Sequence, residues 1–107
     1  MLNLTQTWIK AAVEHRIIEL RYYSEKTKKE FTIREVEPDF IGASRDGSTS
    51  GCWATFCHLR RAGPRCFKEE TILGYHATDK TFEPSPYGRW RELLSAYKQL
   101  GLAEKPF

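Results

Sequence analysis

A run of arginines and aromatic residues between residues 53 and 68 carries the clearest chemical signal in this sequence. Read as WATFCHLRRAGPRCFK, it places four cations among several rings. Guanidinium groups bind phosphates through paired hydrogen bonds, and aromatic rings stack on bases. The mixture therefore suits an anionic ligand with flat parts, such as a nucleotide or a nucleic acid. The alternative is an ordinary β-hairpin whose outer face is solvated by arginines.

Strand periodicity selects the candidate residues within and around this run. Arg65 and Phe67 are two positions apart, so they share one face of a regular strand and form the preferred pair of cation and stacking ring. Tyr23 is a second candidate stacking platform, with a core position as the alternative. The other candidates lie near the turn after residue 57 or in the polar loop 25–30, where lysines would attract an anion. The complete predicted ligand-binding set is Arg65, Phe67, Arg60, His58, Tyr23, Lys28 and Lys29.

The totals indicate one globular domain spanning residues 1–107. Hydrophobic residues make up 40% of the chain and charged residues 29%, which is typical of a folded protein. The net charge of +3 does not by itself indicate nucleic-acid binding, but residues 58–68 hold four cations and no acid. No apolar run resembles a signal segment or a membrane span, and the cysteines number three. We therefore expect a cytoplasmic protein with free thiols and no membrane contact.

Apolar spacing predicts a short helix followed by consecutive strands. The helix covers residues 4–15, with Asn3 or Thr5 as its cap. In the first strand, Ile18, Leu20 and Tyr22 share one face, and in the second we expect Phe31 and Ile33 to point inward. Gly74 predicts a bulge or bend in the last strand. The expected strands are 17–24, 31–37 with a continuation at 40–43 beyond Pro38, 52–59, and 65–77.

A second helix is predicted at 86–100, where apolar residues recur at helical spacing. Ser85 is its expected N-cap and Gly101 its C-cap. We expect its apolar stripe to pack on the open side of the sheet; a dimer or partner surface is the alternative. The stripe comprises Trp90, Leu93, Leu94, Tyr97 and Leu100. This layout predicts a mainly β, α+β domain: a small, strongly bent antiparallel sheet or small barrel with a helix at each end.

Four short motifs now line up in order along the chain. They are Ile9-x-x-Ala12-Val13, Ile18-x-Leu20-x-Tyr22, Arg34-x-Val36-x-Pro38, and Cys57-His58-Leu59-Arg60 followed by Arg65-x-Phe67 and Ile72. Together they resemble the WYL domain family of bacterial regulators, over residues 9–83. In that family a strand ending in an aromatic–Cys pair precedes a basic turn, an Arg-x-Phe strand and a closing isoleucine.

The resemblance implies a barrel of the Sm or SH3-like type over residues 9–83, with the 86–100 helix packed on it. It also implies a role in ligand sensing or transcription regulation, with nucleic acids or nucleotides as ligands. The chain departs from the family in two places: its Trp-Tyr-Leu triplet aligns with Gly51-Cys52-Trp53, and Thr71 stands where an arginine is frequent. Family members usually carry a DNA-binding helix-turn-helix before this domain, and we expect none in the short segment before residue 17.

Metal binding and catalysis find little support in the sequence. The thiols and imidazoles lack Cys-x2-Cys spacing, and adjacent strand residues point to opposite faces, which argues against zinc and against a Cys–His catalytic pair. The residues concerned are Cys52, Cys57, His58, Cys66 and His76. The acids Glu35, Glu37 and Asp39 would share a strand face, and we expect a solvated strand end there. We therefore expect no enzyme, no cofactor and no metal.

The predicted function is that of a non-catalytic binding or regulatory module. Its expected ligand is single-stranded nucleic acid or a nucleotide-like anion, bound on the basic aromatic face. The alternative is a protein-interaction or oligomerisation module that acts through the C-terminal helix or a sheet edge. A second copy of the chain or a regulatory protein would then be the partner.

Overall fold

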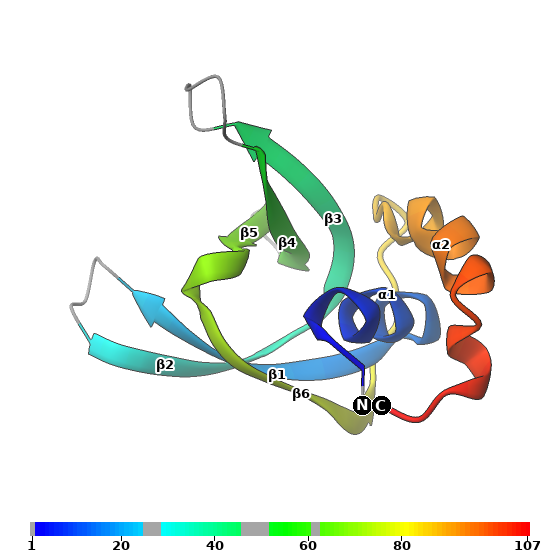
Figure 1. The fold of residues 1–107 in the computed structure, drawn as a ribbon, viewed down its shortest axis with the longest axis horizontal. Helices are drawn as coiled ribbons and strands as arrows, with labels where there is room; N and C mark the ends of the chain where they lie inside the picture. The colour runs from blue at the N-terminus through cyan, green and yellow to red at the C-terminus, as the bar shows by residue number, and fades with distance from the viewer. Residues whose placement is uncertain (1, 25–28, 46–51, 61–62) are drawn as a thin grey trace.

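The computed structural model describes residues 2–24, 29–45, 52–60 and 63–107, with side chains at 2–23, 33–42 and 67–107. Two antiparallel sheets of three strands, ordered β2-β1-β6 and β3-β4-β5, lie beside the helices (Figure 1). The strands are β1 (Arg16–Ser24), β2 (Lys29–Val36), β3 (Pro38–Arg45), β4 (Cys52–Arg60), β5 (Gly63–Lys68) and β6 (Ile72–Thr81). The expected α+β fold, in which β structure dominates, is confirmed.

The bend of the sheet lies at the boundary between β2 and β3. Only Glu37 separates the two strands, yet β2 pairs with β1 while β3 pairs with β4. Pro38 opens β3, where its missing N–H removes one possible ladder bond. The chain therefore passes from one sheet to the other at this point, which agrees with the interruption of the strand that the sequence predicted at Pro38. The following strand, β3, curves strongly in Figure 1.

The strand predicted over residues 65–77 is instead two strands in different sheets. A 3-10 turn, η1 (Glu69–Thr71), separates β5 from β6, and the Thr71 hydroxyl donates a 2.8 Å hydrogen bond to the Lys68 carbonyl. Local polar hydrogen bonding of this kind competes with strand pairing. The irregularity expected at Gly74 is confirmed, because the β1–β6 register shifts between Arg21, opposite Gly74, and Tyr22, opposite Ile72.

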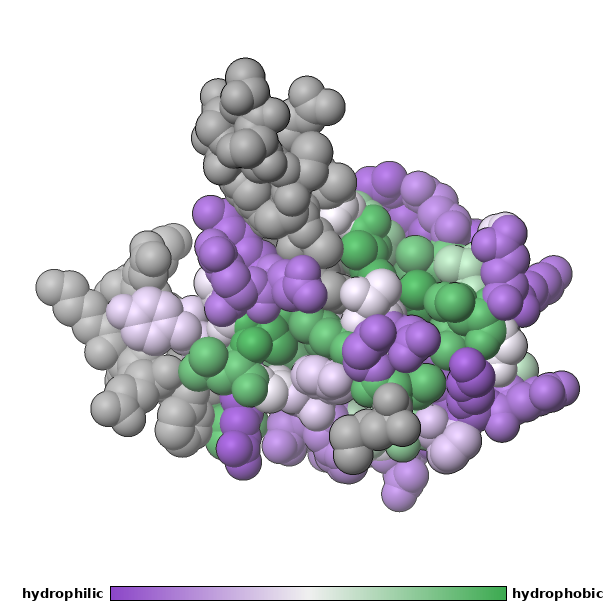
Figure 2. All heavy atoms as spheres, in the orientation of Figure 1, coloured by the Kyte–Doolittle hydropathy of each residue, from purple (hydrophilic) through white to green (hydrophobic). Residues whose placement is uncertain are grey.

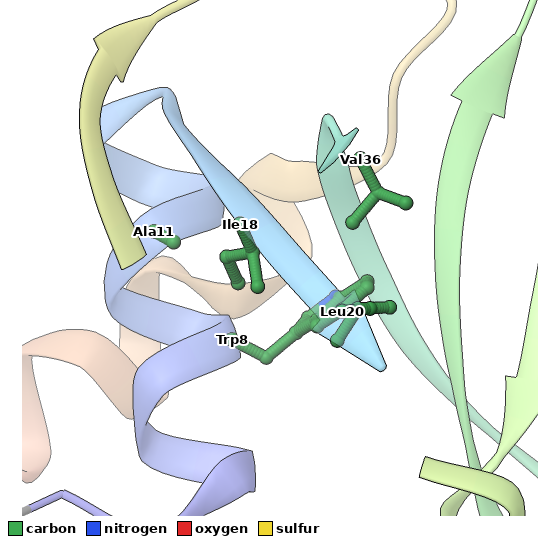
Figure 3. Close-up of a cluster of buried hydrophobic side chains, with 5 residues drawn as sticks. All are labelled: Trp8, Ala11, Ile18, Leu20 and Val36. Atoms are coloured by element: carbon green, nitrogen blue, oxygen red, sulfur yellow. The ribbon is translucent and has the colours of Figure 1, made fainter. Parts of the chain in front are cut away.

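The main core lies between α1 (Leu4–Glu14) and the inner face of β1. Figure 3 shows five buried side chains of this core, which come from α1, β1 and β2. They are Trp8, Ala11, Ile18, Leu20 and Val36. The predicted inward face of β1 is therefore correct. The inward placement of Ile33 is wrong: Ile33 lies opposite Arg21 on the outer face and is 51% exposed. The β1–β2 register places Arg34, opposite Leu20, on the inner face instead.

Asn3, one of the two N-cap candidates from the sequence, caps α1 and forms a capping box with Gln6. The Asn3 side chain accepts the Gln6 N–H at 2.9 Å, and the Gln6 side chain accepts the Asn3 N–H at 3.2 Å. The helix ends at His15, which takes a left-handed conformation with φ of 59°. Among the helices that the structure describes, none is long and apolar enough to cross a membrane.

The C-terminal helix is shorter than predicted. It comprises the 3-10 turn η2 (Trp90–Leu93), α2 (Leu94–Gln99) and the 3-10 turn η3 (Leu102–Glu104). Gly101 has φ of 61° and ends α2 as expected. The η2 turn packs on both α1 and β3, α2 and η3 pack on α1, and most of the apolar side chains of the segment lie inside the molecule. This second core contains Leu2, Ile9, Ala12, Leu93 and Leu102.

Asp39 explains why the helical segment begins at Trp90 and not at Pro86. Its carboxylate accepts the backbone N–H groups of Arg89, at 2.9 and 3.0 Å, and of Trp90, at 3.1 Å. Ser85 instead forms a turn, in which its hydroxyl accepts the Tyr87 N–H and its carbonyl accepts the Gly88 N–H. The prediction that the acids lie at a solvated strand end is therefore wrong for Asp39, whose side chain is buried and only 4% exposed. Desolvation by this burial raises the pKa of Asp39 above its ordinary value, although the backbone N–H groups oppose the shift.

Candidate ligand-binding site

Of the two predicted site residues whose side chains the structure describes, Phe67 joins the two sheets. It lies on β5, is half-buried, and packs on the ring of Tyr22 from β1 with the ring centroids 4.7 Å apart and the planes tilted by 49°. Stacked or tilted aromatic pairs at this separation stabilise a fold beyond their buried area. The two rings therefore connect the β2-β1-β6 sheet with the β3-β4-β5 sheet.

Arg34 adds a cation to this ring pair. It lies opposite Leu20 in the β1–β2 register and is half-buried on the inner face. Its guanidinium carbon is 5.9 Å from the centroid of the Tyr22 ring, within cation–π range. Among the described side chains, none forms an ion pair with Arg34. Arg34, Tyr22 and Phe67, which we call the inner aromatic cluster, thus combine two rings with a cation that has no carboxylate partner among these side chains.

The backbone register places further predicted positions on the same face as Phe67. His58 lies directly opposite Arg65, and Phe56 lies opposite Phe67. Opposite residues of an antiparallel pair share a face, and so do residues two apart along a strand. Positions 58 and 65 are therefore on the face of Phe67, whereas Arg60 pairs with Gly63 at the end of the ladder. The side chains of His58, Arg60, Arg65 and Lys29, and the whole of Lys28, lie outside the described residues.

Tyr23 is separated from this cluster. It follows Tyr22 on β1, and adjacent residues on a strand point to opposite faces. Its side chain is 42% exposed, on the outer face with Arg21. The structure therefore does not bring Tyr23 and Phe67 together. Of the residues considered for zinc, His76 alone has a described side chain, and it is exposed on β6.

The ligand-binding residues predicted from the sequence did not include two members of the inner aromatic cluster, Tyr22 and Arg34. Both occur in the ordered motifs, and Tyr22 shares the strand face of the core residues Ile18 and Leu20. That periodicity places Tyr22 inside the molecule. The position of Arg34 depends on the β1–β2 register, which the sequence alone does not reveal.

This chain is similar in fold to a solved structure. It is proteasome accessory factor B/C (PafBC) of Arthrobacter aurescens, matched with a TM-score of 0.56 and 23% sequence identity. The match covers 79% of this chain but only 13% of the PafBC chain. The likeness concerns the fold and supports a WYL-like one. No protein-family model matches this chain, and no curated protein matches it.

Proposed function

We propose that this chain is a non-catalytic regulatory module that binds single-stranded nucleic acid or a nucleotide-like anion at the inner aromatic cluster. The observation that carries the proposal is the placement of the Arg34 guanidinium 5.9 Å from a ring that packs 4.7 Å from Phe67. A guanidinium binds a phosphate through two parallel hydrogen bonds, and a neighbouring ring stacks on a base. Both ligand parts thus find partners within one cluster.

Two further observations support this location. Positions 58 and 65, a histidine and an arginine in the sequence, share the face of Phe67 in the β4–β5 register. The likeness to a WYL-like fold is consistent with the regulatory role that the ordered motifs imply. Arg65 is proposed as a second phosphate ligand, and Lys28 and Lys29 as residues that attract the anion from a distance.

The proposal is tested by the fluorescence anisotropy of labelled oligo(dT) and oligo(U) across a salt series. Arg34→Ala is expected to weaken binding about tenfold and to reduce the salt slope by about one, because one phosphate contact is lost. Arg65→Ala is expected to act in the same direction. No binding of wild type at low salt would contradict the nucleic-acid proposal, and unlabelled nucleoside monophosphates would then test the small-anion form of it by NMR.

Arg91→Ala is the matched control for charge. Arg91 is exposed and lies over Trp90 at 4.7 Å, so it is also a cation beside a ring, but on η2 and outside the cluster. If Arg91→Ala weakens binding as much as Arg34→Ala, the effect reflects net charge rather than a site. Circular dichroism of each variant confirms that the fold is retained.

The alternative function, assembly through the C-terminal helix, receives less support. Trp90, Leu93 and Tyr97 belong to the second core with α1. Leu100, which is 39% exposed, is the member of the stripe that remains open. A helix whose apolar residues are engaged inside the molecule has little left to offer a partner.

A further inference from the structure

We propose that a small hollow between the start of β3 and the segment that follows β6 binds the ammonium end of a primary alkylamine. The hollow has a volume of about 80 Å³. Its described lining residues come from two stretches, 37–39 and 82–90, and the second stretch includes the yellow segment that leads from β6 to η2 in Figure 1. The inference is independent of the ligand proposed for the inner aromatic cluster, because the two sites share no residue.

The walls of this hollow are mainly apolar. Phe82 and Trp90 contribute aromatic rings, and Pro38 and Pro84 contribute aliphatic ones. Ring faces attract cations, and apolar walls favour the methylene groups next to an ammonium. The volume is far below the roughly 300–1,000 Å³ of ordinary small-molecule sites, so the hollow suits one short group rather than a base or a sugar.

The two aromatic walls are held in place from outside the hollow. The His15 ring packs edge-on against Phe82 and Trp90, with centroid distances of 5.8 and 4.7 Å. The indole N–H of Trp90 is buried and has no acceptor among the described residues, so one polar group in this wall is unsatisfied. Fixed walls and an unsatisfied donor are more typical of a binding pocket than of a packing gap.

The charged residues that line the hollow are acidic. They are Glu37, Asp39 and Glu83, and none of the described lining residues is basic. Both oxygens of Asp39 already accept backbone N–H groups at the start of η2. Glu37 and Glu83 are exposed, and neither forms an ion pair with a described side chain. These two carboxylates are therefore available to an ammonium group in the hollow.

Two arginines lie near the hollow and leave this negative charge in place. Arg89 bonds Glu92 through Nε at 2.5 Å and Nη2 at 2.9 Å, and its guanidinium carbon is 4.0 Å from the centroid of the Phe40 ring. Arg91 is exposed and lies over the Trp90 ring at 4.7 Å, which shows that this ring attracts a cation. The single charge of Arg91 stands against two free carboxylates, so the local surplus is negative and selects a cationic ligand.

The test titrates ¹⁵N-labelled wild-type protein with n-butylammonium, 1-butanol and ammonium at matched low ionic strength, followed by NMR shifts. Butanol keeps the chain without the charge, and ammonium keeps the charge without the chain. We expect butylammonium to shift the amides of Glu37, Asp39, Phe82 and Glu83 and to bind at least about fivefold more tightly than either comparison compound. No shifts, shifts confined to other residues, or equal affinity for either comparison compound would overturn the proposal.

Apolar surface elsewhere on the molecule provides an internal comparison. Hydrophobic residues reach the surface where η1 leads into β6 (Figure 2), and Leu73 there is 59% exposed. A ligand that binds through its butyl chain alone would shift amides around Leu73, and it would do so with butanol as well. Shifts at the hollow that butylammonium causes and butanol does not would assign the binding to the charge.

Removal of single charges from the protein gives a second measurement. Glu37→Gln and Glu83→Gln keep the side-chain shape, and each is expected to weaken butylammonium binding about threefold, with about tenfold for the double variant. Glu70→Gln makes the same charge change at an exposed position on η1 and is expected to keep the wild-type affinity. An equal loss in Glu70→Gln would show attraction to net charge rather than a site, and would overturn the proposal.

A last titration separates the two sources of a primary ammonium group. Nα-acetyl-lysine methylamide presents the group as a protein side chain does, whereas butylammonium presents it as a free amine. If the lysine compound binds as tightly as butylammonium and shifts the same amides, a lysine side chain of a partner protein fits the hollow. If it binds at least about fivefold more weakly, the hollow is assigned to free amines, because the added backbone is then excluded.

Discussion

Lys10 and Glu14 form a largely buried ion pair, with Nζ and Oε2 2.8 Å apart, that fastens the C-terminal segment to α1. The Lys10 ammonium also donates a 2.7 Å hydrogen bond to the Leu102 carbonyl and lies 5.0 Å from the centroid of the Phe107 ring. The Tyr97 hydroxyl donates to the same Glu14 oxygen at 2.6 Å. One turn of α1 thus holds α2, η3 and the last residue of the chain.

Removing the ammonium should loosen this attachment. Lys10→Met keeps most of the side-chain volume but leaves the Leu102 carbonyl without its donor and Glu14 without its cation, with only the Tyr97 hydroxyl donating to that carboxylate. We expect a loss of about 2 kcal/mol in the free energy of unfolding, measured by urea denaturation, because buried polar partners are left unpaired. Lys98→Met, at an exposed position on α2, is the control and should change the free energy of unfolding little. Equal effects of the two substitutions would contradict the role assigned to Lys10.

Because of Tyr97, the free energy of unfolding should depend on pH in the alkaline range. Desolvation, followed by the hydrogen bond to Glu14 and the charge of Glu14, raises the pKa of Tyr97 to about 12 from an ordinary value of 10.0. A raised pKa in the folded state gives stability that is fully present below pH 10 and is lost as the pH rises toward 12. The difference in the free energy of unfolding between wild type and Tyr97→Phe should therefore shrink between pH 9 and pH 11.5. A difference that stays constant over this range would contradict the shift.

Because of Asp39, the free energy of unfolding should also depend on pH in the acidic range. Asp39→Ala removes the acceptor for the Arg89 and Trp90 N–H groups, and we expect it to cost about 1–3 kcal/mol in the free energy of unfolding. Because burial raises the pKa of Asp39, its protonated form is favoured in the folded state, and this contribution is lost as the pH rises through the folded pKa. The wild-type advantage over Asp39→Ala should thus grow from pH 7 to pH 4. Glu37→Ala, at an exposed neighbour, should show no such trend.

Two glycines offer a matched pair of substitutions. A Cβ at Gly88 would lie 2.8 Å from Oδ1 of Asp39 and 3.1 Å from the Ser85 carbonyl oxygen, whereas a Cβ at Gly74 would meet the Arg21 side chain at 3.5 Å, an ordinary contact. Gly88→Ala should lower the free energy of unfolding by about 1–3 kcal/mol through steric strain. Gly74→Ala should be tolerated far better. Thermal unfolding of both variants checks this, and a similar loss of stability in both would contradict it.

Local sequence signals predicted the elements whose determinants are themselves local. The N-cap at Asn3, the alternation of Ile18 and Leu20, and the C-cap at Gly101 all depend on residues close in the chain. Ile33 shows where such signals fail. Its apolar side chain suggested an inward position, but pairing with β1 gave that position to Arg34. A one-residue difference in register moves every side chain to the other face, and periodicity within one strand does not define it.

The sequence by itself determined the α+β class, the residue types that suit an anionic ligand, and the chain positions of most strands. Only the tertiary structure decided which residues meet. Tyr22 and Phe67, 45 positions apart, come together because β1 and β5 belong to sheets joined through the bend between β2 and β3. Likewise, Asp39 starts the helical segment at Trp90 from across the fold. The physical reason is that strand register, the bend of the sheet and capping from another element are long-range contacts, which residue spacing along the chain does not encode.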